Sequence, residues 1–165
     1  MNCPSCKNAL GVFIISEVKV YVCEKGCGGL WFNRVAIKII PRCPDTAGRA
    51  LLIIGQADGV RSFRDVEHIC PQCESTLLYR HFFSKEHDLE VDQCSKCGGL
   101  WIDFGRKNLF RKYAHSGEKF YMEKWHNFEG VLREKFENMK GMHPDLLESR
   151  DQILQVFRFI SPERK

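Results

Sequence analysis

Eight of the nine cysteines in this chain fall into four closely spaced pairs. The two later pairs follow the pattern Cys-x2-Cys, twenty residues, Cys-x2-Cys. A two-residue spacer lets two sulfurs converge on one ion from a tight turn, and two such turns complete the tetrahedron that zinc takes with four thiolates. The spacing therefore predicts a four-cysteine zinc site made by Cys70, Cys73, Cys94 and Cys97.

The two earlier pairs have a similar but less regular spacing. Sixteen residues separate them, and the second pair holds three residues between its cysteines, in the sequence CEKGC. We expect Gly26 to absorb the extra residue, because glycine has no Cβ to obstruct a tight turn. The pattern predicts a second zinc site and so two Zn²⁺ per chain, with the ligands Cys3, Cys6, Cys23 and Cys27.

Other chemistry is open to cysteine and histidine. A pair such as Cys94 and Cys97 suits a dithiol redox protein, but the βαβ context of thioredoxin-like proteins is absent, and four matching pairs favour metal. The odd cysteine, Cys43, is expected to be a free thiol in the core or at the surface. No histidine stands at metal-ligand or triad spacing, and a closed four-thiolate shell leaves no position for water or substrate. We therefore expect a non-enzymatic protein with no evident small-molecule substrate.

The elements that must hold these sulfurs occur twice. The pentapeptide CGGLW appears at Cys27–Trp31 and at Cys97–Trp101, and around it the segments Cys3–Phe32 and Cys70–Ile102 align as one repeated unit. Residues rich in β-branched and aromatic side chains predict two hairpin strands in each unit. These are Val12–Ile15, Val18–Val22, Leu77–Phe83 and Leu89–Asp92.

The paired glycines follow the last cysteine of each unit. We expect the backbone to turn sharply there with positive φ and with amide groups aimed at sulfur, which Gly98 and Gly99 allow without a Cβ clash. Leu100 and Trp101 should then lie against the hairpin and give the small metal unit some apolar cover.

The rest of the chain divides into a connecting segment and helices. Apolar runs at Val35–Ile40 and Ala50–Ile54, broken by prolines, predict short strands or extended packing. Beyond Trp101, helices are expected at Asp103–Tyr113, with Asp103 as N-cap, and at Glu118–Lys140. A last helix is expected from Pro144, with an apolar face of Leu146, Ile153, Leu154, Phe157 and Ile160.

These elements predict a small α+β protein: two zinc-ribbon β-hairpin units with a helical C-terminal region. The predicted organisation is a first zinc ribbon at 1–33, a connecting segment with short strands at 34–69, a second ribbon at 70–103, and the helical region at 104–165.

The repeat resembles the transcription factor IIB-like zinc-finger family of prokaryotic proteins. The resemblance rests on the Cys-Pro-x-Cys opening and on CGGLW, and it implies the ribbon fold and the metal. That family continues with Asp-Arg-Gly-Glu-Leu. Here Asp103 and Gly105 match, whereas Arg106 and Lys107 stand where glutamate and leucine are expected, and in the first unit only Arg34 matches.

Two classes of partner remain open for such a binding module. The basic, aromatic stretch Phe104–Trp125 suits nucleic acid, and transcription-associated contacts would come from its basic residues, although a solvated amphipathic helix is the simpler reading. The aromatic stripe Tyr121–Met139 suits a protein adaptor or a homodimer seam. The residues assigned to nucleic acid are Arg106, Lys107, Arg111 and Lys112.

Net charge and cellular location do not decide between nucleic acid and protein as the partner. The formal charge of +4 falls to about zero when eight thiolates bind two zinc ions, so net charge does not argue for nucleic acid. No apolar run approaches the length of a membrane span, and a cysteine at position 3 leaves no room for a secretory signal peptide. We expect a cytoplasmic protein with no membrane contact, where paired cysteines bind metal.

Overall fold

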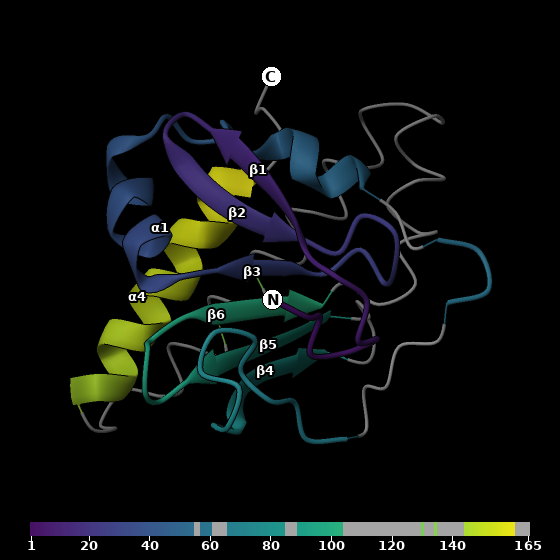
Figure 1. Ribbon diagram of the computed structural model, residues 1–165. Helices are drawn as coiled ribbons and strands as arrows, with labels where there is room; N and C mark the ends of the chain where they lie inside the picture. The colour runs from purple at the N-terminus through teal and green to yellow at the C-terminus, as the bar shows by residue number, and fades with distance from the viewer. Residues whose placement is uncertain are drawn as a thin grey trace.

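The architecture is one antiparallel sheet of six strands in the order β1-β2-β3-β6-β5-β4, with helices on one face (Figure 1). The computed structural model describes residues 1–54, 57–60, 66–84, 89–103, 130, 134 and 144–160. The strands are β1 (Gly11–Ile15), β2 (Val18–Val22), β3 (Leu30–Phe32), β4 (Leu78–Ser84), β5 (Leu89–Cys94) and β6 (Leu100–Asp103).

The four hairpin strands confirm the prediction from the sequence. In the first hairpin, Ser16 and Glu17 both take positive φ, as the two-residue turn between twisted strands requires. Val18, Val20 and Val22 alternate with less buried residues and point into the core. In the second hairpin, β4 and β5 pair over their whole lengths, with an irregularity in register between Arg80 and Phe82.

The third strand of each unit joins the two ribbons. We expected Leu100 and Trp101 only to cover a hairpin, but β3 and β6 pair antiparallel at the centre of the sheet, with Trp31 opposite Trp101. The residues that close each ribbon therefore also bind the other one. This pairing makes a single continuous sheet from the two repeats.

The second glycine of each CGGLW makes room for the tryptophan of the other unit. A Cβ on Gly99 would overlap the ring of Trp31, and a Cβ on Gly29 would overlap the ring of Trp101. Both tryptophans are fully buried. Positive φ was expected at Gly98 and Gly99, but only Gly98 adopts it, at 71°. Gly99 is required for space, because the facing indole lies against its backbone.

The connecting segment is helical, and the expected strands are wrong. The run after β3 forms α1 (Arg34–Ile39), followed by the 3₁₀ turns η1 (Ile40–Arg42) and η2 (Arg49–Ile53). The side chain of Asn33 caps α1 by accepting a hydrogen bond from the backbone N–H of Ala36 at 2.8 Å. With that cap in place, Ile37 is buried against the sheet, and packing overrides the β propensity of the run.

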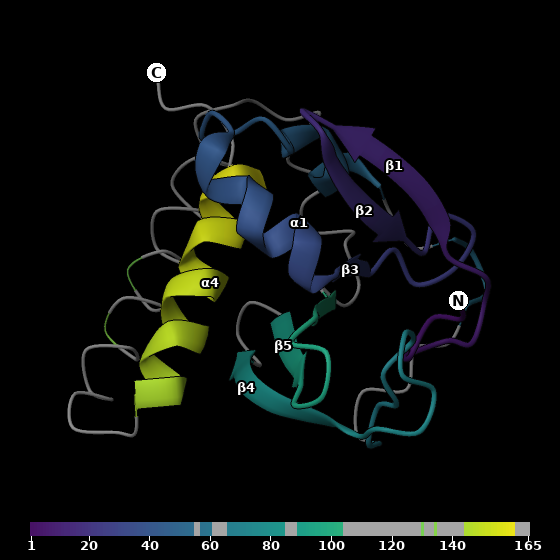
Figure 2. The same ribbon diagram turned by 60° about the vertical axis from the view of Figure 1, so that its left-hand side comes forward.

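The last helix, α4 (Pro144–Ile160), begins at the residue predicted. Figure 2 shows α1 and α4 together on one side of the sheet. Ile153, Phe157 and Ile160 are buried as expected, and the ring of Phe159 meets that of Phe32 edge-on at 6.5 Å between centroids. Together with β2, β3, β5, β6 and η2, these helices enclose the larger apolar core.

The two helices predicted between β6 and α4, at Asp103–Tyr113 and Glu118–Lys140, lie outside the described residues apart from three positions. Gly130 and Glu134 are helical. Asp103 was predicted to be the N-cap of the first of these helices, but it ends β6 and is buried. Within the described part of the chain, no helix combines the length and the apolar character needed to cross a membrane.

The contact between the two repeats predicts the effect of adding one methyl group. We expect Gly99→Ala to lower the free energy of unfolding of the zinc-loaded protein by about 1–3 kcal/mol, because the new Cβ forces the Trp31 ring out of its place. Urea denaturation would measure the change. Gly11→Ala is the matched control, since its Cβ would make ordinary contacts at 3.7 Å or more. Equal stability of the two variants would contradict the close fit.

Candidate metal centres

The four sulfurs of each predicted site come together. In each group the Sγ atoms all lie within 4.8 Å of one another. A tetrahedral zinc ion with Zn–S bonds of about 2.3 Å needs sulfurs about 3.8 Å apart, whereas a disulfide needs about 2.05 Å. The Sγ–Sγ distances include 3.5 Å for Cys3–Cys27, 3.3 Å for Cys6–Cys23, 3.7 Å for Cys70–Cys97 and 3.9 Å for Cys73–Cys94. The spacing fits zinc and excludes disulfides.

Tight turns of the backbone hold the sulfurs in place. The N–H of Cys73 donates to the Sγ of Cys70 at 3.3 Å, and the N–H of Cys97 donates to the Sγ of Cys94 at 3.5 Å. Amides aimed at sulfur were expected from the glycines, and the backbone of Gly99 does hydrogen-bond the thiol of Cys97; the cysteines add amides of their own. The N–H of Gly98 instead donates to the carbonyl of Cys94 at 2.9 Å and closes the turn. These bonds hold the sulfurs in the orientation that one metal ion requires.

The extra residue in the first site is accommodated at Gly26, as predicted. A Cβ there would lie 2.5 Å from the Sγ of Cys23 and 2.7 Å from the Sγ of Cys6, so only glycine fits beside the sulfurs. Two residues later, the N–H of Gly28 donates to the carbonyl of Cys23 at 2.9 Å, matching the bond that Gly98 makes to Cys94. The longer turn therefore returns to the same geometry.

Without metal, the crowded thiols hold their protons unequally. Hydrogen bonds from neighbouring thiols, first that of Cys27, lower the pKa of Cys23, whereas the hydrogen bond with Cys23 raises the pKa of Cys27. In the second site, burial opposes ionisation of Cys94, but backbone N–H groups including that of Cys97 outweigh it and lower its pKa. Burial raises the pKa of Cys70 and of Cys97.

A third group of ligand-type side chains was missed in the sequence. His68, Glu90 and Asp92 are buried together, with the Nδ1 of His68 2.7 Å from a carboxylate oxygen of Asp92. The guanidinium of Arg80 pairs with Glu90 and, at 3.1 Å, with Asp92. Because that cation pairs with both carboxylates, we interpret the group as an ion-pair network that ties β4 to β5. The available signal in the sequence is the opposite charge of residues on the two strands of a predicted hairpin, since Arg80 and Asp92 are direct cross-strand neighbours.

The remaining predicted residues lie apart from both clusters. The Sγ of Cys43 is 3.3 Å from the carbonyl of Ser16 and packs beside the larger core, so it belongs to neither group of four sulfurs. Four further residues, those assigned to nucleic acid, lie outside the described residues: Arg106, Lys107, Arg111 and Lys112.

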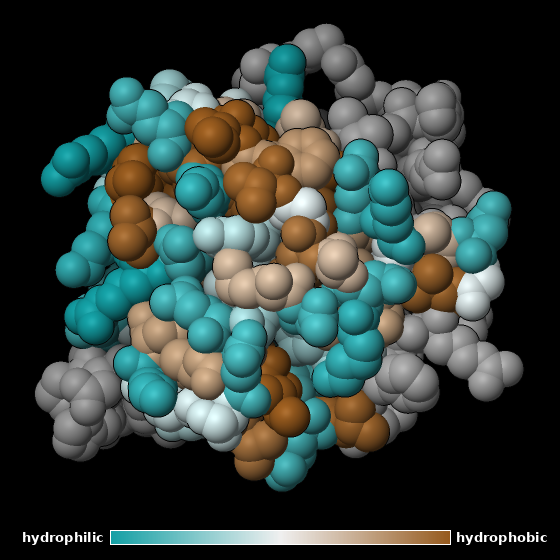
Figure 3. All heavy atoms as spheres, in the orientation of Figure 1, coloured by the Kyte–Doolittle hydropathy of each residue, from teal (hydrophilic) through white to brown (hydrophobic). Residues whose placement is uncertain are grey.

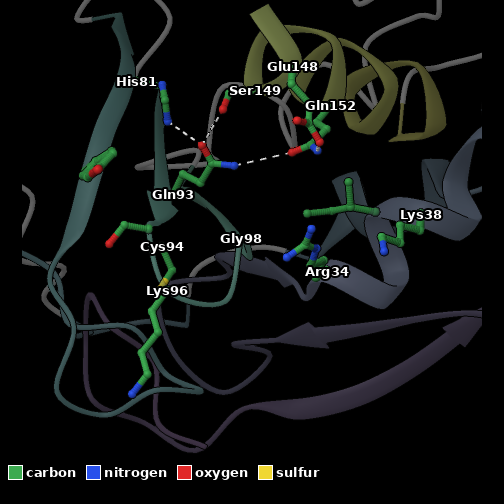
Figure 4. A pocket seen from close by; sticks show the side chains of 13 residues that line it. Arg34, Lys38, His81, Gln93, Cys94, Lys96, Gly98, Glu148, Ser149 and Gln152 are labelled. Atoms are coloured by element: carbon green, nitrogen blue, oxygen red, sulfur yellow. Dashed lines mark hydrogen bonds between the residues drawn. The ribbon is translucent and has the colours of Figure 1, made fainter. Parts of the chain in front are cut away.

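A cavity of ≈ 430 Å³ lies beside the second metal centre (Figure 4). The side chains of α1, α4, β4, β5 and the turn before β6 form its walls, so both repeats and the last helix contribute. Its polar lining includes Arg34, Lys38, Tyr79, His81, Gln93, Lys96, Glu148, Ser149 and Gln152. Sequence reasoning missed this site, because its residues are scattered along the chain and meet only through the pairing of the ribbons.

Comparison with protein families agrees with the two metal centres. The family model described as the transcription factor zinc-finger matches residues 2–40 and again residues 69–106, and each match contains one complete set of four cysteines. The chain carries two zinc-ribbon domains of this family. The first match extends through α1, so the helix after the third strand lies within the matched region. Neither the curated proteins nor the solved structures provide a match.

The two zinc-ribbon domains predict two zinc ions per chain by elemental analysis. We expect Cys97→Ser to lose one zinc and to unfold the second unit, because structural zinc contributes on the order of 10 kcal/mol to a small domain. Cys43→Ser is the control and should keep both ions, since its sulfur belongs to neither cluster. One zinc in the parent would mean that the longer turn has broken the first site, and loss of zinc on changing Cys43 would show that it is a ligand.

Zinc binding predicts a pH dependence of stability. Cysteine binds zinc as a thiolate at pH values far below the ordinary thiol pKa of about 8.5, so the stabilisation by zinc is present at neutral pH and is lost as the pH falls and protons displace the metal. Thermal unfolding of the zinc-loaded protein across pH, with zinc content measured at each pH, would follow both changes. Stability that stays constant while zinc is released would contradict the assignment.

Proposed function

We propose that the chain is a non-catalytic binding module whose partner is nucleic acid. Four protein sulfurs around each zinc leave no coordination position for water or a substrate, which supports a structural role for the metal. No enzyme family is matched. The joined sheet supplies a rigid platform on which surface side chains keep fixed positions.

The observation that carries the choice of nucleic acid is a local concentration of positive charge. Arg34, Lys38 and Lys96 are all exposed and line the same cavity, where Glu148 is the one carboxylate among the described lining residues. Arg34 and Lys38 stand one helical turn apart on α1 and so share a face. Since the zinc-loaded chain has a net charge of about zero, attraction to phosphate must come from such a local cluster.

The basic stretch beyond β6 extends this proposal. Arg106, Lys107, Arg111 and Lys112 follow β6 within nine residues of its end and would add phosphate contacts next to the rigid sheet. Phosphate contacts of this kind position a protein on nucleic acid without reading its sequence.

A protein partner is the second candidate, and the edge of the sheet favours it. Val12 is 53% exposed and Ile14 is 70% exposed on β1, and apolar side chains gather over the β1–β2 hairpin in Figure 3. Among the described strands β1 pairs with β2 alone, so its other edge offers backbone groups to an added strand. The predicted stripe at Tyr121–Met139 would add to such an adaptor or homodimer surface.

Salt dependence separates the two candidates. We expect the parent to bind single-stranded oligonucleotides tightly at low salt and weakly at moderate salt, because each neutralised phosphate releases counterions. Changing Arg34, Lys38 and Lys96 together to glutamine should weaken binding and reduce the slope of log affinity against log salt by about 2. Fluorescence anisotropy would measure both quantities.

The control for this experiment removes the same charge elsewhere. Lys19, Lys25 and Arg42 are exposed but do not line the cavity, and their change to glutamine should leave the slope nearly unaltered. A second variant with Arg106, Lys107, Arg111 and Lys112 changed to glutamine tests the basic stretch separately. No binding by the parent at low salt would overturn the proposal and leave the protein partner.

A further inference from the structure

We infer that the cavity between α1, α4 and the second ribbon takes one unpaired base of a single-stranded nucleic acid, an inference that rests on the proposed function and names its site. A volume of ≈ 430 Å³ lies within the range of small-molecule sites, about 300–1,000 Å³. A base inside a duplex is paired and stacked and cannot enter such a cavity, so the ligand must be unpaired.

Hydrogen bonds fix the polar groups of one wall. The Oε1 of Gln93 accepts from the hydroxyl of Ser149 at 2.8 Å and from the Nε2 of His81 at 2.7 Å, which sets the orientation of the amide (Figure 4). The Nε2 of Gln93 then donates to the Oε1 of Gln152 at 3.4 Å, and the Nε2 of Gln152 donates to Glu148 at 3.0 Å. Each amide is therefore held with its donor and acceptor ends in known directions.

The held amides leave hydrogen-bonding capacity for a ligand. An amide nitrogen carries two N–H groups, and in the bonds described Gln93 and Gln152 each use one of them. Glu148 also has a second carboxylate oxygen. A wall that offers oriented donors and acceptors matches the edge of a base, which presents both, better than it matches a bare anion, which only accepts.

An exposed aromatic side chain adds a stacking surface. Tyr79 is 47% exposed although it lies on a strand, and its ring is 5.7 Å from that of His81 between centroids. Burial lowers the pKa of His81, so its ring is neutral at physiological pH and suits contact with an uncharged base. Bases stack on such rings with little regard to sequence.

The three cations lie at different sides of the same opening. Arg34 and Lys38 approach from α1, whereas Lys96 extends from the turn that carries Cys94 and Cys97 (Figure 4). The stem of Arg34 also lies near Gly98, where an added Cβ would be 3.6 Å from its Cδ, so α1 is close to this turn. Phosphates on both sides of a bound base would each meet a cation, and a free nucleotide has a phosphate on one side alone. This favours a base within a strand.

The test compares full-length, zinc-loaded variants by anisotropy with labelled single-stranded oligonucleotides of each base. We expect Tyr79→Leu and Gln152→Leu each to weaken binding about tenfold with the salt slope unchanged, because they remove stacking and base contacts but no charge. Gln152→Leu should also alter the order of preference among the four bases. Ile14→Ala, which changes an exposed strand residue far along the sheet order, should bind as the parent does.

Competition and folding controls make the outcomes distinct. Thermal unfolding and zinc content should match the parent in all variants. If the parent binds nucleic acid but Tyr79→Leu and Gln152→Leu bind equally well, the base site is wrong and the proposed function stands. If the parent binds no nucleic acid, both the base site and the proposed function fail.

Competition with other ligands tests what the cavity recognises. If inorganic phosphate or a phosphopeptide competes as effectively as a single strand, the cavity is an anion site and the base site is wrong. If a mononucleotide competes as effectively as the strand, recognition of a base within a strand is overturned.

Discussion

The distance between sulfurs around a zinc ion is the constraint on which the rest of this molecule depends. Ligands about 3.8 Å apart force each cysteine pair into a tight turn, and the turn fixes where the following glycines stand. Gly29 and Gly99 are thereby held where the indoles of Trp101 and Trp31 can lie against them. The metal sites therefore act beyond their own ribbons, since they place the surfaces through which the ribbons meet.

The apolar core depends on the pairing of the two ribbons through β3 and β6. β3 and β6 lie at the middle of the sheet, and their buried residues contribute to both apolar clusters, one around the sulfurs and one beneath the helices. α1 packs on this face because Asn33 starts it directly after β3, and α4 then covers the remaining apolar surface. The cavity beside the second metal centre is a product of the same arrangement, because its walls come from both repeats and α4.

Much of this could be predicted from the sequence where the signal is local. Cysteine spacing identified both metal sites, runs of β-branched and aromatic residues identified the hairpin strands, and Pro144 marked the start of α4. What failed depended on contacts distant in the chain. The pairing of β3 with β6 has no local signature, and the β-branched run after Asn33 becomes helical only because the sheet buries one side of it. The cavity residues form no recognisable motif in the sequence, because they come from separate elements that the fold brings together.

The exchange of tryptophan and glycine between the repeats has a consequence for how such a chain can arise. Each unit offers the other the same features, a strand edge, an indole and a bare backbone, so the contact is isologous and one unit is complementary to a copy of itself. Two separate copies would form a two-fold symmetric dimer by this contact. Joining them in one polypeptide replaces a concentration-dependent association with a permanent one. Once permanent, the two halves no longer need to be equal, and segments outside the shared contact are free to diverge.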